Sequence, residues 1–330
     1  MPKPDVTLAI VTRNRSVTLQ RLLSAIITPS WQQPDSIVIY DNSTDGLTEL
    51  MVNEFDGIVY IKGNKRQHGG ANEILRRIET DIISFLDDDV LIQGDYFRYL
   101  RQDYAIDHEH HIGSVGGPAI SVDSRGKPLQ PIHSGTGFNK VYNSPGLILN
   151  QDHSPCWIPD EICEVDILRG ANMSFRTEVL RQVGGFNESM ESSGAWWGEE
   201  TDPQLSIRDM GYKILYDPRL RVDHYLHHSG GTRSENDLRS SMSKAYGNAR
   251  NQMYILKKHG LLSICYLTRW ILWTTVTGDY GLLHQLGILR RVHSLNDSRE
   301  SLLAYGVPLT FKFLVLMSLF RGWAVGFVNE

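Results

Sequence analysis

The sequence predicts an α/β fold built on a mostly parallel central sheet flanked by helices. Two observations support the sheet, and a third indicates a helical region at the C-terminal end. Short apolar, β-branched segments alternate with helix-forming segments in the N-terminal part of the chain. Polar residues follow directly after several of these strand-like segments. The last hundred residues or so instead favour helices. Because parallel sheets bind ligands at the carboxyl ends of their strands, we expect a ligand site there.

The N-terminal elements follow in strand–helix order. Strands are expected at 6–12, 36–40, 58–61 and 82–86, where apolar and β-branched residues dominate. Helices are expected between them, at 17–27, 47–54 and 71–80. The first helix has Ser16 as a suitable N-cap and apolar residues at helical spacing on one face.

The pattern is less regular further along the chain. Strands are expected at 115–120, from residue 165, at 212–216 and at 222–224, and helices at 177–183, 205–210 and 240–259. Residues 121–160 are rich in Gly, Pro, Ser and Asn, which indicates an extended irregular region. Irregular segments of this length are usually functional, so we expect this one to contribute to a substrate pocket.

Three consecutive carboxylates, Asp87, Asp88 and Asp89, follow the apolar strand expected at 82–86. Burying them without partners would be costly, and a divalent cation such as Mg²⁺ or Mn²⁺ is the natural partner for hard oxygen ligands. Alternate residues of an extended segment point the same way, so Asp87 and Asp89 are expected to converge while Asp88 points elsewhere. The alternative is a solvated acidic turn, which is the commoner outcome for an isolated D-x-D pair.

Two other strand ends carry polar residues. Residues 12–15 (Thr-Arg-Asn-Arg) end the first strand, and Asp41 and Asn42 end the second. A nucleotide lying across these ends would let Asp41 bond a base or ribose hydroxyl and let Arg13 or Arg66 approach a phosphate. Helix-start chemistry is the alternative for Arg13 and Asn14. Neither the dinucleotide-binding G-x-G-x-x-G pattern nor a Walker pattern follows the first strand.

A second acidic group precedes the helix expected at 205–210: Glu199, Glu200 and Asp202. A carboxylate at a helix start tends to stay ionised, and an ionised carboxylate in a cleft can act as a general base. Helix capping is the alternative, although it explains one acid better than three. His224 ends a strand-like segment, where a lone histidine is usually structural and less often a metal ligand.

Seven blocks in this order resemble family-two glycosyltransferases with the Rossmann-like GT-A fold, over about residues 5–230. Each block is weak alone, but their shared order makes chance agreement improbable. They are residues 9–15, 41–46, 85–90, 169–176, 184–188 and 198–202, and His224.

The resemblance implies transfer of a sugar, with inversion, from a UDP-, GDP- or dTDP-sugar donor to a hydroxyl acceptor, with Mn²⁺ or Mg²⁺ as cofactor. Asp87, Asp89 and His224 match the metal-binding positions. Glu200 matches the catalytic base, although the family usually has Asp there and Asp202 is the alternative. Trp196, Trp197 and Glu199 are the expected acceptor-binding residues, with core packing as the alternative for the tryptophans. The expected nucleotide-binding residues are Thr12, Arg13, Asn14, Arg15, Asp41, Asn42, Arg66, Asp87 and Asp88.

Composition and apolar patterning indicate which partners and which cellular location to expect. The net charge of -5 argues against a nucleic-acid partner. The three cysteines form no C-x-x-C pair, and the N-terminus has no signal-peptide pattern, so a cytoplasmic, reducing location is expected. Two apolar stretches, 261–276 and 307–328, contain charges and are too short for clean membrane spans. They favour an interfacial helix pair at the cytoplasmic face of a membrane, or else a soluble helical subdomain or a homo-oligomer interface.

Two domains are expected: a catalytic domain at 1–235, with a nucleotide-sugar part at 1–115 and an acceptor part at 116–235, and a helical region at 236–330. The expected acceptor is a glycan or a polyprenyl-linked glycan. Two other functions are weighed. A sugar-nucleotide nucleotidyltransferase would need a glycine-rich basic loop after the first strand, and this sequence has no glycine there. An inactive carbohydrate-binding or scaffold protein on the same fold would have lost the acidic residues, which are all present.

Overall fold

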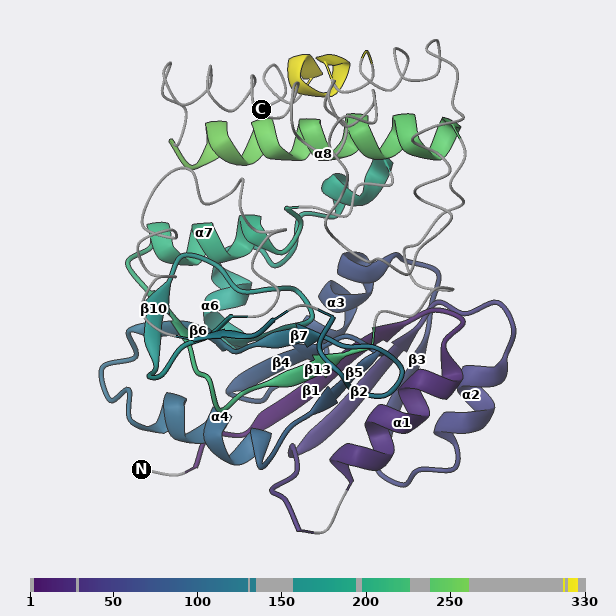
Figure 1. The fold of residues 1–330 in the computed structure, drawn as a ribbon, viewed down its shortest axis with the longest axis vertical. Helices are drawn as coiled ribbons and strands as arrows, with labels where there is room; N and C mark the ends of the chain where they lie inside the picture. Colours follow the sequence, from purple (N-terminus) through teal and green to yellow (C-terminus); the bar gives the residue numbers. More distant parts are fainter. Residues whose placement is uncertain are drawn as a thin grey trace. The chain divides into compact units, whose positions relative to one another are not determined.

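The computed structural model describes residues 3–27, 30–129, 131–134, 157–193, 198–225, 238–260, 317 and 320–325. Two compact units make up the chain (Figure 1). The first comprises Met1–Glu188 and Glu200–Arg233, and the second comprises Ser189–Glu199 and Ser234–Glu330.

The first unit is built on an eight-stranded sheet with the order β10-β12-β6-β11-β4-β1-β2-β3. Pairs β1–β2, β1–β4, β2–β3 and β6–β12 are parallel, whereas β11 runs antiparallel to both of its neighbours and β10 runs antiparallel to β12. The predicted mostly parallel α/β sheet is therefore confirmed. The strands are β1 Val6–Thr12, β2 Ser36–Asp41, β3 Ile58–Lys62, β4 Ile82–Leu86, β6 Ile112–Gly116, β10 Cys163–Val165, β11 Asn172–Arg176 and β12 Lys213–Tyr216.

Helices cover both faces of this sheet because the strands are apolar on both sides (Figure 1). In β1, Val6, Leu8 and Ile10 pack on one side and Ala9 packs on the other. One face is covered by α1 Ser16–Ile26, α2 Leu47–Val52 and α4 Tyr96–Ala105. The other is covered by α3 Gln67–Leu75, α6 Thr177–Gln182 and α7 Thr201–Asp209.

A smaller sheet carries part of the site, with the order β5-β13-β7. Its strands are β5 Val90–Ile92, β13 Val222–His224 and β7 Ala119–Ser121. The single strand predicted at 115–120 is wrong, because the chain leaves β6 at Gly117-Pro118 and enters this second sheet as β7. Gly117 passes so close to the chain that an added Cβ would lie 2.5 Å from the Asp217 carbonyl oxygen. A two-stranded pair, β8 His133–Ser134 and β9 Trp157–Ile158, also forms.

Several helix bounds differ from those predicted. Helix α3 starts four residues earlier than expected and contains Gly70, where an added Cβ would lie 2.6 Å from the Tyr40 ring. A side chain at position 70 would meet this ring because the helix packs directly on β2. Helix α7 begins at Thr201, so the acidic group lies at its first turn. Helix α4 was not predicted, because Arg101 and Asp103 are buried among its apolar residues and obscure the pattern.

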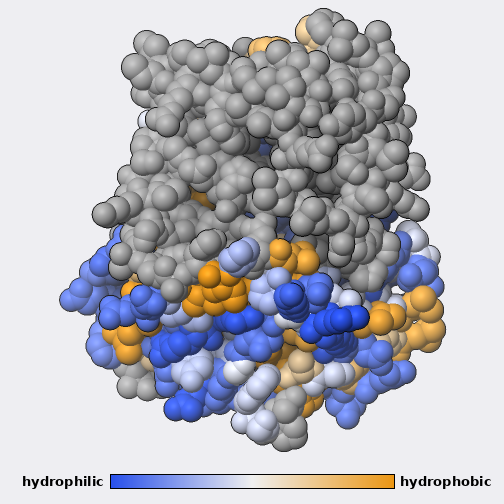
Figure 2. Space-filling model, viewed as in Figure 1, coloured by the Kyte–Doolittle hydropathy of each residue, from blue (hydrophilic) through white to orange (hydrophobic). Residues whose placement is uncertain are grey.

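The described surface of the first unit is mostly hydrophilic and is interrupted by separate hydrophobic patches (Figure 2). On α1 and α2, Val17, Leu47 and Leu50 are exposed at 77%, 53% and 68%. Other apolar side chains of these helices, such as Leu22 and Met51, point into the core. Each helix is therefore amphipathic with isolated exceptions, and its inward face fixes it on the sheet.

In the second unit, α8 Leu238–Lys258 buries Ala249, Met253, Ile255 and Leu256. Its Arg250 and Asn251 side chains donate hydrogen bonds to the carbonyl oxygen of Met190, which lies in the 3₁₀ helix Glu188–Ser193. The helix predicted at 240–259 is confirmed. Among the described residues, no helix combines the length and apolar character needed to span a membrane. The stretch 261–276 and most of 307–328 and 121–160 lie outside the described residues.

A pair of buried carboxyl groups, Asp103 of α4 and Asp217 after β12, lies beside Arg219. The Arg219 guanidinium donates to Asp217 Oδ2 at 2.7 Å and to Asp103 Oδ1 at 2.8 Å. Asp103 Oδ2 is buried and receives no hydrogen bond from the described residues. Burial and the adjacent Asp217 carboxylate raise the pKa of Asp103 to about 8. The Asp103 carboxyl group is therefore protonated near neutral pH.

This pair makes stability depend on pH. Because the folded pKa of Asp103 lies above its unfolded value, its favourable contribution is complete below about pH 4 and is lost as pH rises towards about 8. In Asp103→Asn, an amide N–H replaces the proton of the Asp103 carboxyl group. We expect its Tm to exceed that of the wild type by roughly 3–6 °C at pH 8, or about 1–2 kcal/mol, and by less at pH 5.

Thermal unfolding between pH 5 and pH 9 measures this difference. Asp107→Asn is the matched control, because hydrogen bonds from Arg176 and the backbone outweigh burial and lower the pKa of Asp107. Because the pKa of Asp107 lies below its ordinary value, this carboxyl group is ionised throughout this pH range, and the destabilisation of Asp107→Asn should stay constant from pH 5 to pH 9. Parallel pH dependences for wild type and Asp103→Asn would contradict a protonated Asp103 near neutral pH.

Candidate active site

The three predicted acids form a turn between β4 and β5. Asp88 and Asp89 are 4% exposed, and Asp87 is half-buried. The backbone here is a turn and not extended, so the geometric reason given for the convergence of Asp87 and Asp89 was wrong. The convergence itself occurs, because the turn and its side-chain partners direct each carboxylate.

Asp88 lies outside the cluster that Asp87 and Asp89 form, and residues at the end of β1 and just after it hold its carboxylate. Thr12 Oγ1 donates to Asp88 Oδ2 at 2.7 Å, and Arg15 Nη1 donates to Asp88 Oδ1 at 2.8 Å. Burial raises the pKa of Asp88 to about 6, although Arg15 and Thr12 both stabilise its ionised form. Asp88 therefore serves as an anchor for the turn.

Arg15 bridges two of the acids. The same Nη1 that bonds Asp88 also donates to Asp89 Oδ2 at 3.0 Å. Burial opposes its charge, but Asp88 and Asp89 together raise the pKa of Arg15 above its ordinary value. Thr12 and Arg15, expected to contact a nucleotide, thus hold the acidic turn in place. The bond from Arg15 fixes Asp89 Oδ2 and leaves Oδ1 facing His224.

His224 comes from a distant part of the sequence and completes a cluster with Asp87 and Asp89. Strand β13 pairs with β5, which sets His224 opposite Val90, one residue beyond Asp89. His224 Nε2 lies 3.1 Å from Asp89 Oδ1 and 4.0 Å from Asp87 Oδ2. One ligand atom from each of the three residues lies within 4.8 Å of the other two.

This cluster fits a divalent cation. Two carboxylate oxygens and an imidazole nitrogen face one another over distances that a single ion can span. Burial and the charge of Asp89 raise the pKa of Asp87, whereas His224, Arg15 and Arg169 lower it. A positive charge among these atoms would therefore relieve a repulsion already present in the protein. His224 Nδ1 is buried and bonds no described residue.

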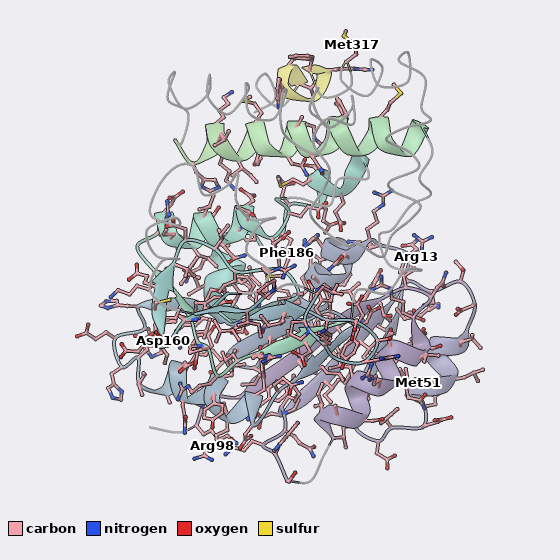
Figure 3. The ribbon with its side chains drawn as sticks, in the orientation of Figure 1. Arg13, Met51, Arg98, Asp160, Phe186 and Met317 are labelled. Carbon is pink, nitrogen blue, oxygen red and sulfur yellow. The ribbon has the colours of Figure 1, made fainter. Side chains whose placement is uncertain are left out.

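The loop ends of β1 and β2 are tied together by the other predicted nucleotide-binding residues. Asn14 adopts a φ of 53°, accepts a hydrogen bond from the Thr44 amide, and donates its own amide hydrogen to Ser43 Oγ. The Asn42 amide donates to the Thr12 carbonyl oxygen. Arg13 and Arg66 are exposed near these loops, and Figure 3 shows Arg13 beyond the end of β1.

Asp41 is fully buried, and protein groups bond both of its carboxylate oxygens. Tyr60 and Lys62 donate to Oδ2 at 2.6 and 2.8 Å, and the Ser43 amide donates to Oδ1 at 2.8 Å. Burial alone would raise the pKa of Asp41, but these hydrogen bonds lower it below its ordinary value. Asp41 therefore organises the loop after β2 as an ionised group.

Glu200 lies at the start of α7 with its carboxyl group over Gly170, where an added Cβ would lie 3.4 Å from Glu200 Cδ. Gln204 donates to the Glu200 carbonyl oxygen at 2.8 Å and also bonds the Leu168 backbone. The adjacent residue Ala171 accepts a hydrogen bond from the Asp87 amide. A short path of contacts therefore links the Glu200 carboxyl group to the acidic turn. Asp202 is 4% exposed.

Two residues near the acids were not assigned a role from the sequence. A ring nitrogen of His68, in the first turn of α3, lies within 4.8 Å of a Glu200 carboxylate oxygen. Arg169 directly precedes Gly170, and its positive charge lowers the pKa of Asp87. Nothing local in the sequence marks His68, although Arg169 lies inside a family-like block. Glu199 is 6% exposed, and the predicted acceptor residues Trp196 and Trp197 lie outside the described residues.

Comparisons with curated proteins return glycosyltransferases. The chain is 23% identical over 233 residues to poly-beta-1,6-N-acetyl-D-glucosamine synthase of Staphylococcus aureus (strain COL), covering 66% of this chain and 50% of the relative. It is also 23% identical over 226 residues to pre-mycofactocin glycosyltransferase of Mycobacterium tuberculosis (strain CDC 1551 / Oshkosh), covering 67% of this chain and 42% of that one. The chain thus spans about half the length of these relatives.

Solved structures of glycosyltransferases share the fold. Mannosyltransferase PcManGT from Pyrobaculum calidifontis, in complex with GDP-Man and Mn²⁺, matches with a TM-score of 0.54 and 16% identity, covering 99% of this chain and 88% of that chain. S. aureus TarS 1-349, in complex with UDP-GlcNAc, matches with a TM-score of 0.51 and 14% identity, covering 98% and 89%. These matches confirm the predicted GT-A fold.

A family model described as "Glycosyltransferase like family 2" matches residues 2–244, which is most of the chain. The matched region contains every residue of the acidic turn, His224 and Glu200. The chain therefore belongs to the glycosyltransferase-like family 2.

Proposed function

We propose that this protein is an inverting, metal-dependent glycosyltransferase that moves a sugar from a nucleoside-diphosphate donor to an acceptor hydroxyl. The convergence of Asp87, Asp89 and His224 beyond the carboxyl end of β4 carries this proposal. Glu200 supports it, since its carboxyl group lies over Gly170, and the next residue, Ala171, accepts a hydrogen bond from the Asp87 amide of the same turn. Membership of the family and the GT-A fold agree with this reaction class.

Asp87, Asp89 and His224 would hold the divalent cation. When bound, the cation supplies charge neutralisation for the diphosphate leaving group. Arg15 fixes one oxygen of Asp89, and Asp88 holds Arg15, so the ligand carboxylate is oriented before substrate arrives. An imidazole nitrogen in the donor set favours Mn²⁺ over Mg²⁺, because Mg²⁺ prefers oxygen ligands almost exclusively.

Glu200 would act as the general base. Its place at the start of α7 favours the ionised carboxylate. The acceptor oxygen forms a bond to the anomeric carbon as the acceptor proton moves to Glu200 and the bond to the phosphate oxygen breaks. Attack from the face opposite the leaving group inverts the anomeric configuration.

The donor is proposed to be a UDP-, GDP- or dTDP-sugar, and the acceptor a glycan or a polyprenyl-linked glycan. The solved structures that share the fold contain GDP-Man or UDP-GlcNAc, which supports the nucleoside-diphosphate class. The name of the staphylococcal relative includes N-acetylglucosamine, which makes N-acetylhexosamine donors the first to test.

Thermal shift and slow donor hydrolysis test the proposal on the full chain. We expect one donor to raise the Tm in Mn²⁺, to do so less in Mg²⁺, and to have almost no effect in EDTA. At 100 times Kd, the stabilisation should be about 2.7 kcal/mol. Hydrolysis of the same donor should require the metal.

The outcomes separate the alternatives weighed from the sequence. Release of pyrophosphate from a nucleoside triphosphate and a sugar phosphate would support a nucleotidyltransferase instead. Stabilisation by free glycans, without any response to nucleotide or metal, would support a carbohydrate-binding scaffold. Equal shifts in Mn²⁺ and in EDTA would contradict the metal dependence.

A further inference from the structure

Arg169 lies between the two functional parts of the site. It precedes Gly170, which underlies the Glu200 carboxyl group, and Ala171, whose carbonyl oxygen accepts the Asp87 amide hydrogen. The turn that contains Arg169 is closed by a hydrogen bond from the Asn172 amide to the Arg169 carbonyl oxygen at 3.0 Å. Asn172 is itself fully buried. The backbone at Arg169 is therefore held at a fixed position.

The Arg169 guanidinium is also held, but by one of its nitrogens only. Nη1 donates to the Ala119 carbonyl oxygen at 2.6 Å. Ala119 is in β7, the strand that pairs with the His224 strand, β13. The remaining donors of the guanidinium bond no described residue, and the side chain is half-buried. Arg169 thus keeps a partly desolvated set of N–H donors beside the candidate metal cluster.

The charge of Arg169 is not matched by an acid in contact with it. Arg15, by comparison, lies within 3.0 Å of two carboxylates. Among the described residues, no carboxylate lies within ion-pair distance of Arg169. Its charge nevertheless acts on Asp87, since it opposes the rise in the pKa of that group caused by burial and by Asp89. A cation that is fixed, half-buried and not neutralised is suited to bind an anion.

We propose that Arg169 binds the β-phosphate of the nucleotide-sugar donor and stabilises the leaving diphosphate. This deepens the proposed function and rests on it. The bond that breaks joins the anomeric carbon to a β-phosphate oxygen, and its electron pair moves onto that oxygen. This bond must lie between the metal-binding acids and the base, where the 169–171 segment also lies. The planar guanidinium can donate two parallel N–H groups to phosphate oxygens.

The test compares nucleotide binding by Arg169→Gln, Arg169→Lys and the wild type, measured calorimetrically with UDP, GDP, UMP and GMP. We expect Arg169→Gln to weaken diphosphate binding about 10–100-fold, both in Mn²⁺ and in EDTA, and to leave monophosphate binding unchanged. Arg169→Lys should recover part of the loss, because lysine supplies the charge without the planar fork. Arg98→Gln is the control, and Figure 3 shows Arg98 on α4, away from Arg13.

Several results would overturn the inference. One such result is unchanged diphosphate affinity in Arg169→Gln. A second is an equal loss of affinity for monophosphates and diphosphates in that variant. A third is an equal loss of diphosphate affinity in Arg98→Gln. If Arg169→Gln does not fold, Arg169→Lys still tests the inference, because its affinity for diphosphates relative to monophosphates should be lower than that of the wild type. A wild-type protein that binds no nucleotide would refute the proposed function as well, whereas binding unaffected by position 169 refutes only this inference.

Discussion

Replacing Asp89 with asparagine is expected to lower metal-dependent transfer by about 10²–10³-fold and to abolish the Tm increase caused by Mn²⁺. Asp89 Oδ1 faces His224 Nε2 at 3.1 Å, and its Oδ2 is fixed by Arg15. Asparagine keeps the shape but removes the charge that would draw a cation into the cluster. Activity and Mn²⁺ affinity, the latter by calorimetry, measure the two effects separately.

The same substitution should leave the metal-free protein at least as stable as the wild type. Asp89 raises the pKa of the half-buried Asp87, which means that the two carboxylates repel each other. Loss of activity with an unchanged or higher Tm in EDTA therefore marks a defect in metal binding. Asp56→Asn, in the exposed turn before β3, is the control for removing one acid. Full Mn²⁺-dependent activity in Asp89→Asn would refute the metal cluster.

Glu200→Gln is expected to lower kcat by about 10²–10⁴-fold while donor binding in Mn²⁺ stays within a few-fold of the wild type. Glutamine fills the same space over Gly170 but cannot accept the acceptor proton. The contacts of Gln204 with the backbone at 168 and 200 do not involve the Glu200 side chain, so the start of α7 should persist. Steady-state kinetics with the identified donor, together with donor Kd, give both numbers.

Two further variants test the assignment of the base. Asp202→Asn should lose much less activity than Glu200→Gln, and the reverse order would transfer the role to Asp202. Glu178→Gln changes an exposed acid in the first turn of α6 and is the control for altering an acid at a helix start. A Glu200→Gln enzyme with nearly normal kcat would rule out Glu200 as the base.

Local sequence patterns predicted most of the first unit because the responsible forces are local. The apolar runs at 6–12 and 82–86 form strands buried on both faces. The apolar side chains at 19, 22, 23 and 26 lie on one side of α1, and that side packs against the core. The helix α4 was missed because Arg101 and Asp103 are buried in it. Arg101 bonds Asp35 and the Gln33 carbonyl oxygen, far away in the sequence, and no periodicity signals such partners.

The sequence alone determined which chemical groups stand at the strand ends: three acids after β4, polar residues after β1 and β2, and acids before α7. Only the tertiary structure decided how they meet. Arg15 reaches Asp88 and Asp89 because β1 and β4 are adjacent parallel strands. His224 reaches Asp89 because β13 pairs with β5, and Arg169 is fixed because β7 pairs with β13. Strand pairing between segments far apart in the sequence depends on how the whole core packs, so the residue types could be identified from the sequence but their geometry could not.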